Sequence, residues 1–350
     1  MKRKQNNLLG IFRFSIFLTV ILAGVTFWQL SWQGLWLFFV LLILEVTFSF
    51  DNAVVNSRTL ASMSLIWQRI FLTVGIFIAV FAVRFLLPIV IVIFASGLNF
   101  GEVVSMALNN PERYSHVLHD ASPMINAFGG IFLLMIGLSY FVDYNKQIHW
   151  VRGVEPWLAR AGKFENFRAC LILLVMVVLY FTVEEKYKAM ILISSVLGTL
   201  LHIGLELFGS LFGSHSSKDI KLKTGWAAFA AFLYLEVLDA SFSFDGVIGA
   251  FAITSSVILI TSGLSAGAIW VRSLTIYLMR SGTLSKYRYL EHGAHWAIVA
   301  LGIMMLFKLF HVELPEWITG SLGLAFIILA IGSSVIEARH SKNTKNLQSS

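Results

Sequence analysis

The chain has 350 residues, of which 57% are hydrophobic and only 13% are charged, and its net charge is +7. A soluble domain of this size cannot hide so much apolar surface, so the composition predicts a protein that lies mostly in lipid. The single cysteine, Cys170, excludes an internal disulfide. The basic residues lie in short loops between apolar segments, a pattern that argues against a nucleic-acid partner.

A helix needs about 20 apolar residues to cross a bilayer. By this measure the sequence predicts an all-α, polytopic membrane helix bundle of about ten spans. The expected spans cover about 11–30, 34–55, 69–95, 124–142, 168–183, 188–212, 226–254, 262–280, 293–311 and 317–336. The first of them lacks a small-residue cleavage site, so we expect a retained helix rather than a signal peptide.

The distribution of Lys and Arg predicts the orientation. Loops on one side of this arrangement carry nineteen of the 26 basic residues, and loops on the other side carry three. Because cytoplasmic loops are enriched in Lys and Arg, both termini are expected in the cytoplasm.

A four-residue segment that ends in an aspartate occurs twice. Phe48 to Asp51 reads Phe-Ser-Phe-Asp, and Phe242 to Asp245 repeats it with an offset of 194 residues. The first copy lies on the second expected span and the second copy on the seventh, so the two halves run in opposite directions. This is an inverted internal repeat, which in transporters places the substrate site near the middle of the membrane.

The sequence divides into four expected parts. They are residues 1–33, a basic segment and the first span; residues 34–183, the first repeat with the acidic motif 45–52 and the basic cytoplasmic loop 143–167; residues 184–337, the second repeat with the acidic motif 236–246; and residues 338–350, a polar cytoplasmic tail.

Carboxylates inside a membrane are costly and usually functional. On a straight helix, positions seven apart share a face, so Glu45 and Asn52 are expected to lie together with Asp51 beside them. If the helix unwinds at the repeated segment, backbone carbonyls also become available. Such hard oxygen ligands suit Mn²⁺, Mg²⁺ or Ca²⁺. The expected metal ligands are Glu45, Asp51, Asn52, Glu236, Asp239 and Asp245.

Two arginines, Arg84 and Arg272, fall in the middle of expected spans. They are either counter-charges for an empty metal site or structural partners of one carboxylate each. Both interpretations predict that each arginine lies within salt-bridge reach of a motif carboxylate, because an unpaired guanidinium in the bilayer is expensive.

Three further groups carry titratable side chains. His202 and Glu206 share a helix face and form either a proton relay or a packing hydrogen bond. His292 and His295 are expected at an interface, in contact with solvent. The 143–167 loop is typical of an amphipathic segment that rests on anionic headgroups.

The motif from Glu45 to Asn52, and the run Glu236-Val-Leu-Asp239-Ala-Ser-Phe-Ser-Phe-Asp245, resemble the TerC-like integral membrane proteins. A bacterial branch of that group shares the segment Glu291-His-Gly-Ala-His295. The resemblance covers roughly residues 40–330, and the group belongs to the lysine-exporter superfamily. It implies metal-ion export across a bacterial inner membrane, with the matching acidic positions at the site. Gly246 departs from the pattern, since a side-chain ligand would be expected there.

We therefore expect an exporter of a divalent cation, Mn²⁺ above all, that works by alternating access and is coupled to protons. The ion is its substrate, and neither a cofactor nor a catalytic residue is expected. One alternative is a non-transporting scaffold or assembly factor. Another is an intramembrane aspartyl hydrolase in which two Asp residues share a proton. The four or five acids near the repeats exceed what such a dyad needs.

Overall fold

The computed structural model describes residues 8–164, 166–212, 222–312 and 316–348. Within these ranges, the side chains of 8, 9, 212, 244, 245, 316, 317, 319, 320 and 340–348 are not described. The elements are α1 (Leu8–Phe48), α2 (Phe50–Ala61), α3 (Leu65–Phe77), the π-helix η2 (Ile78–Leu86), α4 (Leu87–Ser96), α5 (Phe100–Asn109), α6 (Pro111–Asp120), α7 (Ser122–Phe141), α8 (Val154–Ala161), α9 (Phe167–Thr182), the short 3₁₀ helix η3 (Glu185–Tyr187), α10 (Lys188–Phe212), α11 (Gly225–Ile253), α12 (Val257–Ser281), α13 (Thr283–Lys286), α14 (Leu290–Lys308) and α15 (Glu316–Gln348).

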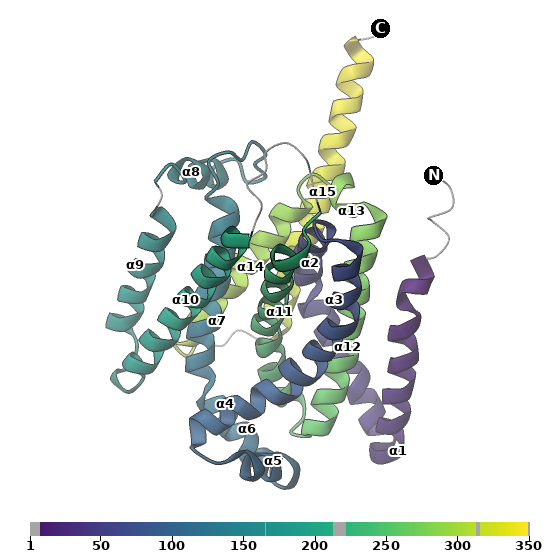
Figure 1. Ribbon diagram of the computed structural model, residues 1–350, viewed down its shortest axis with the longest axis vertical. Helices are drawn as coiled ribbons and strands as arrows, with labels where there is room; N and C mark the ends of the chain where they lie inside the picture. The colour runs from purple at the N-terminus through teal and green to yellow at the C-terminus, as the bar shows by residue number, and fades with distance from the viewer. Residues whose placement is uncertain (1–7, 165, 213–221, 313–315, 349–350) are drawn as a thin grey trace.

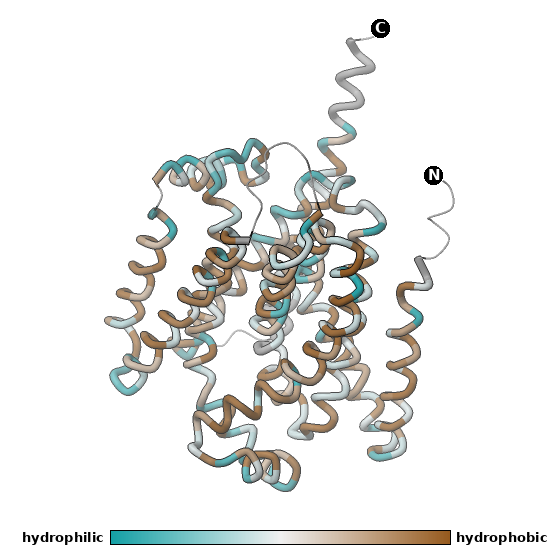
Figure 2. Tube along the Cα trace, viewed as in Figure 1, coloured by the Kyte–Doolittle hydropathy of each residue, from teal (hydrophilic) through white to brown (hydrophobic). Residues whose placement is uncertain are grey.

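The described part of the chain is an all-α bundle, as expected (Figure 1). Eight of its helices are long and apolar enough to cross a membrane, and apolar residues follow the middle of the long helices, while polar residues gather around α8 and at the turns (Figure 2). The chain is thus a multi-pass membrane protein. The count differs from ten because α1 counts once and α9, with only 16 residues, is too short to be counted.

The long helix α1 folds back on itself. Ser31 has φ 56° and ψ −156°, which no helix tolerates. Ser15, before it, lies 2.7 Å from Ser273 of α12, and Glu45, after it, lies against Gly267 of the same helix. On one straight helix, residues 15 and 45 would be about 45 Å apart, whereas positions 267 and 273 are separated by about 9 Å. The two arms of α1, 8–30 and 32–48, therefore both lie along α12.

A π-helix precedes a proline on the way into α4. Pro88 cannot donate a backbone hydrogen bond to the carbonyl of Arg84, and its ring crowds that carbonyl. The segment just before it is η2, in which the helix is wider. Arg84 is buried there, and its Nη1 donates a 2.8 Å hydrogen bond to the carbonyl of Ala79. The local distortion thus positions a charged side chain inside the bundle.

The backbone stays largely helical at both acidic motifs, so the structure does not show the unwinding that would free backbone carbonyls. In the first motif, Ser49 separates α1 from α2 with φ −101° and ψ 14°, yet its amide and carbonyl still make helical hydrogen bonds to Glu45 and Ala53. In the second motif, α11 is continuous from Gly225 to Ile253. Side chains rather than freed carbonyls therefore provide most polar groups at this point.

Candidate functional site

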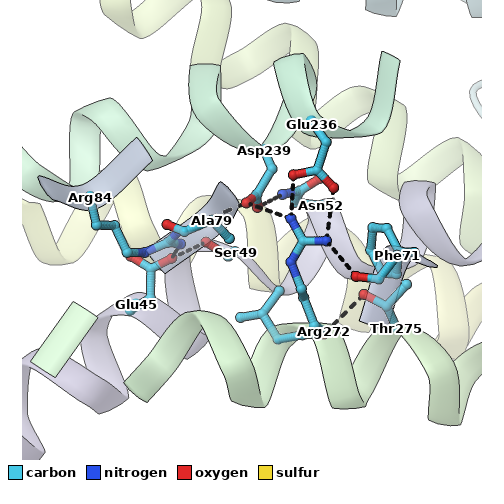
Figure 3. A network of polar contacts seen from close by, with 11 residues as sticks. Glu45, Ser49, Asn52, Phe71, Ala79, Arg84, Glu236, Asp239, Arg272 and Thr275 are labelled. Atoms are coloured by element: carbon cyan, nitrogen blue, oxygen red, sulfur yellow. Dashed lines mark hydrogen bonds and ion pairs between the residues drawn. The ribbon is translucent and has the colours of Figure 1, made fainter. Parts of the chain in front are cut away.

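The two acidic motifs meet in the interior of the bundle. Asn52, in the first turn of α2, donates a 2.9 Å hydrogen bond from Nδ2 to Oδ1 of Asp239 on α11 (Figure 3). Asn52 is fully buried and Asp239 is 5% exposed. The two motifs therefore meet at these two residues.

Glu45 forms the first half of a buried charge network. Its carboxylate makes an ion pair with the guanidinium of Arg84 and accepts a 3.0 Å hydrogen bond from the hydroxyl of Ser49. A methyl group at position 246 would lie 3.3 Å from Oε2 of Glu45. Gly246, which we noted as a missing ligand, thus leaves room for the carboxylate of the other motif.

Glu236 and Arg272 form the second half. Two parallel hydrogen bonds, of 3.0 and 2.8 Å, join the guanidinium of Arg272 to both oxygens of Glu236. Arg272 also donates to the carbonyl of Phe71 and stacks on that ring, 4.3 Å from its centroid. Such a bidentate pair is strong and geometrically specific. The prediction that both mid-span arginines pair with motif carboxylates is confirmed.

Asp239 connects the two halves. Its Oδ2 lies 3.8 Å from Nη1 of Arg84 and 3.4 Å from Nη2 of Arg272 (Figure 3). The network therefore contains three carboxylates, Glu45, Glu236 and Asp239, and only two guanidinium groups. With all groups ionised, the network carries one negative charge in excess.

Asp51 does not join this network. It is buried, but a methyl group on Gly323 of α15 would lie 3.2 Å from its Oδ2, so Asp51 faces α15. Its Oδ1 accepts a hydrogen bond from the backbone amide of Asn52. Adjacent helical residues point about 100° apart, which explains why Asn52 reaches Asp239 and Asp51 does not. Asp245 lies on α11, and its side chain is outside the described residues.

The amide oxygen of Asn52 remains without a hydrogen-bond partner among the described residues, although it is buried. The same holds for the amide oxygen of Asn56, one turn further along α2. Sequence reasoning missed Asn56, although its spacing of four from Asn52 places the two on one helix face.

The described acids, histidines and cysteine include no group of three or more arranged to hold a metal ion. The arginines instead occupy the space between the carboxylates. A cation could bind Glu45 or Asp239 here only by displacing a guanidinium group.

His202 and Glu206 lie in a separate cluster that sequence reasoning left incomplete. Nε2 of His202 is 3.0 Å from the hydroxyl of Ser139 and 3.8 Å from Glu206. Arg168 donates to the same hydroxyl at 2.5 Å and to Glu206 at 3.1 Å. The spacing of four residues predicted only the contact between His202 and Glu206. In the structure Ser139 and Arg168 belong to the same cluster.

The expected solvent contact of His292 and His295 is wrong. Both histidines are buried, and Nδ1 of His292 lies 2.8 Å from the carboxylate of Glu155. Glu155 also accepts hydrogen bonds from the indole of Trp296 and the backbone amide of Trp150, each at 2.8 Å. Burial opposes its ionisation, but the hydrogen bonds outweigh this and lower the pKa of Glu155 below its usual range. The 143–167 segment is therefore fastened to α14 by a buried acid.

The searches of curated proteins and of solved structures returned no match to the chain. A family model described as a protein of unknown function (DUF475) matches residues 50–341. Because this match spans most of the chain and includes Asn52, Arg84, Asp239 and Arg272, the chain belongs to the DUF475 family.

Proposed function

We propose that this protein exports a divalent metal cation, with Mn²⁺ as the preferred substrate, by alternating access around the network of Glu45, Asp239 and Asn52. In this proposal the two arms of α1 and the short helix α9 each cross the membrane, which gives ten spans, and the two halves form an inverted repeat. Both termini lie in the cytoplasm, as the distribution of Lys and Arg indicates.

The shared position of Asp239 is the observation that carries the proposal. Two arginines surround this one aspartate, and the network as a whole has three carboxylates for two guanidinium groups. Charged groups at this depth in a membrane are costly and mark ion pathways more often than packing sites. The resemblance of both acidic motifs to TerC-like proteins supports the same reading.

The arginines then act as resident counter-ions. With the site empty, Arg84 and Arg272 neutralise most of the carboxylate charge. A divalent cation that enters would coordinate the oxygens of Glu45 and Asp239 and push the guanidinium groups toward Ala79 and Phe71, whose carbonyls already accept hydrogen bonds from them. Oxygen ligands of this kind suit Mn²⁺.

Export of positive charge requires a driving force. Moving one charge against the membrane potential costs about 2.3 kcal/mol per 100 mV. Inward proton movement is the simplest source, with protons and metal alternating on the same carboxylates. His202 and Glu206 remain candidates for a relay, since His202 lies 3.0 Å from the hydroxyl of Ser139 and Glu206 accepts a hydrogen bond from Arg168.

The test is a metal profile of cells that make the protein, compared with cells that do not. We expect lower cellular manganese in the producing cells and no such change with Asp239→Asn. Glu185→Gln is the matched control, because Glu185 is 88% exposed and pairs with Lys188 at the surface. An unchanged profile for Mn and for other divalent metals would contradict the proposal.

A structural scaffold is the second candidate, and the pairing of every described motif carboxylate except Asp51 favours it. The two candidates differ in what neutral replacements do. In a scaffold, uncharged side chains of similar volume at both members of a pair leave function intact. In a transporter, the same exchange stops ion movement although the protein folds.

A further inference from the structure

A cavity of about 590 Å³ opens beside the loop that follows α7. Its wall is built from α2, the end of α7 with the following loop, α11 and the start of α14. On α2 it reaches Val55 and Thr59, and on α11 it reaches Tyr234. The basic 143–167 segment contributes Lys146, which places the cavity on the expected cytoplasmic side.

The cavity ends close to the charge network. Val55 and Thr59 follow Asn52 by three and seven residues, which corresponds to about 5 and 10 Å along a helix. Tyr234 precedes Glu236 by two residues on α11. Two separate helices therefore run from the wall of the cavity directly into the network.

Along α2, Asn56 follows the network residue Asn52 and precedes Thr59 of the cavity wall, although Asn56 does not itself line the cavity. It is 2% exposed, and its amide oxygen has no hydrogen-bond partner among the described residues. Asn52, one turn deeper on the same face, has a second unpartnered amide oxygen. A buried acceptor left unpaired costs about 1–3 kcal/mol, so two of them on one face call for a reason. Amide oxygens are ordinary ligands of hard divalent cations.

We propose that this cavity is the cytoplasmic vestibule of the ion path and that the amide oxygen of Asn56 is a transfer ligand, which hands the divalent cation from the vestibule to Asn52 and Asp239. This inference rests on the proposed function and deepens it, because it names the route by which the cation reaches the network.

The charges around the vestibule are compatible with a cation. Arg58 makes an ion pair with Glu291, and Arg288 pairs with Glu337 at 2.8 Å, so both guanidinium groups are neutralised. Lys146 lies over the ring of Tyr140 and donates to its carbonyl. Partial burial is the main reason that the pKa of Lys146 falls to about 7, so near neutral pH this amine is uncharged in a large share of molecules.

Cysteine accessibility tests the route. In a Cys170→Ser parent, which has no other cysteine, we would introduce Thr59→Cys in the vestibule and Asn56→Cys at the transfer position. Leu174→Cys is the control, because this side chain is exposed on the apolar helix α9. A charged thiol reagent that cannot cross the membrane is added to inside-out and right-side-out vesicles, with and without Mn²⁺.

We expect both test cysteines to react in inside-out vesicles and not in right-side-out vesicles, while Leu174→Cys stays unreactive in both. Mn²⁺ should slow the reaction at Asn56→Cys at least fivefold. An unreactive Asn56→Cys beside a reactive Thr59→Cys, or a reaction rate that Mn²⁺ leaves unchanged, would overturn the inference.

Asn56→Leu guards against a cysteine variant that misfolds, because leucine has nearly the shape of asparagine without its oxygen. We expect about tenfold slower Mn²⁺ transport, the lower end of the loss for a residue that supports metal ligands. The unfolding temperature should not fall, because the substitution removes a buried acceptor that has no partner among the described residues. If Asn56→Leu transports Mn²⁺ at the parent's rate, the inference is overturned. The proposed function still stands in that case, because the parent transports the ion. A parent that transports no divalent metal would instead contradict the proposed function itself.

Discussion

Asn52 donates a 2.9 Å hydrogen bond to Asp239, although 187 positions separate the two residues in the chain. This bond joins the two acidic motifs directly and holds the carboxylate that Arg84 and Arg272 share. The geometry has consequences for stability as well as for transport.

Loss of this hydrogen bond should destabilise the protein. Asn52→Leu keeps the approximate volume but leaves Oδ1 of Asp239 without its donor, which costs about 1.5–3 kcal/mol for a charged acceptor. The free energy of unfolding of the purified protein in detergent measures this. Asn109→Leu, at an exposed asparagine whose side chain donates to Ser105, should change it by less than about 0.5 kcal/mol. Equal effects of the two substitutions would argue against the bond.

Arg84→Met alone should lower the stability of the protein more than replacing both Arg84 and Glu45 by uncharged residues. Removing the guanidinium leaves Glu45 charged and buried, which costs about 3–5 kcal/mol. Arg84→Met combined with Glu45→Met removes both charges, so most of that stability should return. Transport by the double variant should nevertheless be lost. A double variant that is stable and transports metal at the normal rate would show that Glu45 is only part of a structural lock.

Close packing of α1 on α12 should depend on Gly267. A methyl group there would lie 2.5 Å from Cβ of Glu45 and 3.0 Å from the carbonyl of Leu42, so Gly267→Ala forces the two helices apart. Overpacking of this kind costs about 1–3 kcal/mol. Gly204→Ala in α10 is the matched control, because nothing lies within 4 Å of its added methyl group. In thermal unfolding the control should be neutral or slightly more stable than the parent, and a Gly267→Ala variant that behaves likewise would refute the contact.

Attachment of the 143–167 segment should depend on pH through Glu155. Because the folded state lowers the pKa of Glu155 below its ordinary value of 4.5, the carboxylate contributes its full stabilisation above that pH. The contribution is lost as the pH falls from 4.5 through the lowered pKa. Hydrogen exchange at the amide of Trp150, corrected for the intrinsic pH dependence, should therefore accelerate below about pH 4.5.

Glu155→Gln serves as the control for this measurement. Its exchange should be faster at neutral pH and should show no step in the acid range. A step of the same size in the variant would assign the pH dependence to another group.

The helical bundle and the pairing of the arginines were predictable from the sequence. An apolar chain in a membrane forms helices, and a charged side chain there needs a partner of opposite charge. Arg84 and Arg272 had to find carboxylates, and they did so within the two motifs. The reversal at Ser31 was not predictable, because it depends on the positive φ of one residue. The partner of Asp51 was not predictable either, because it depends on how α15 packs against α2. The burial of His292 was not predictable, because it depends on a contact with Glu155, which is 137 residues away in the chain.

Transport by the purified protein tests the central claim most directly. The full chain would be reconstituted in liposomes that contain a Mn²⁺-sensitive dye, with an imposed pH gradient, and compared with Asp239→Asn and Glu185→Gln. We expect saturable Mn²⁺ movement for the parent and for Glu185→Gln, and less than about a tenth of that rate for Asp239→Asn. A parent that moves Mn²⁺ and other divalent cations no faster than empty liposomes, or an Asp239→Asn variant as fast as the parent, would contradict the account.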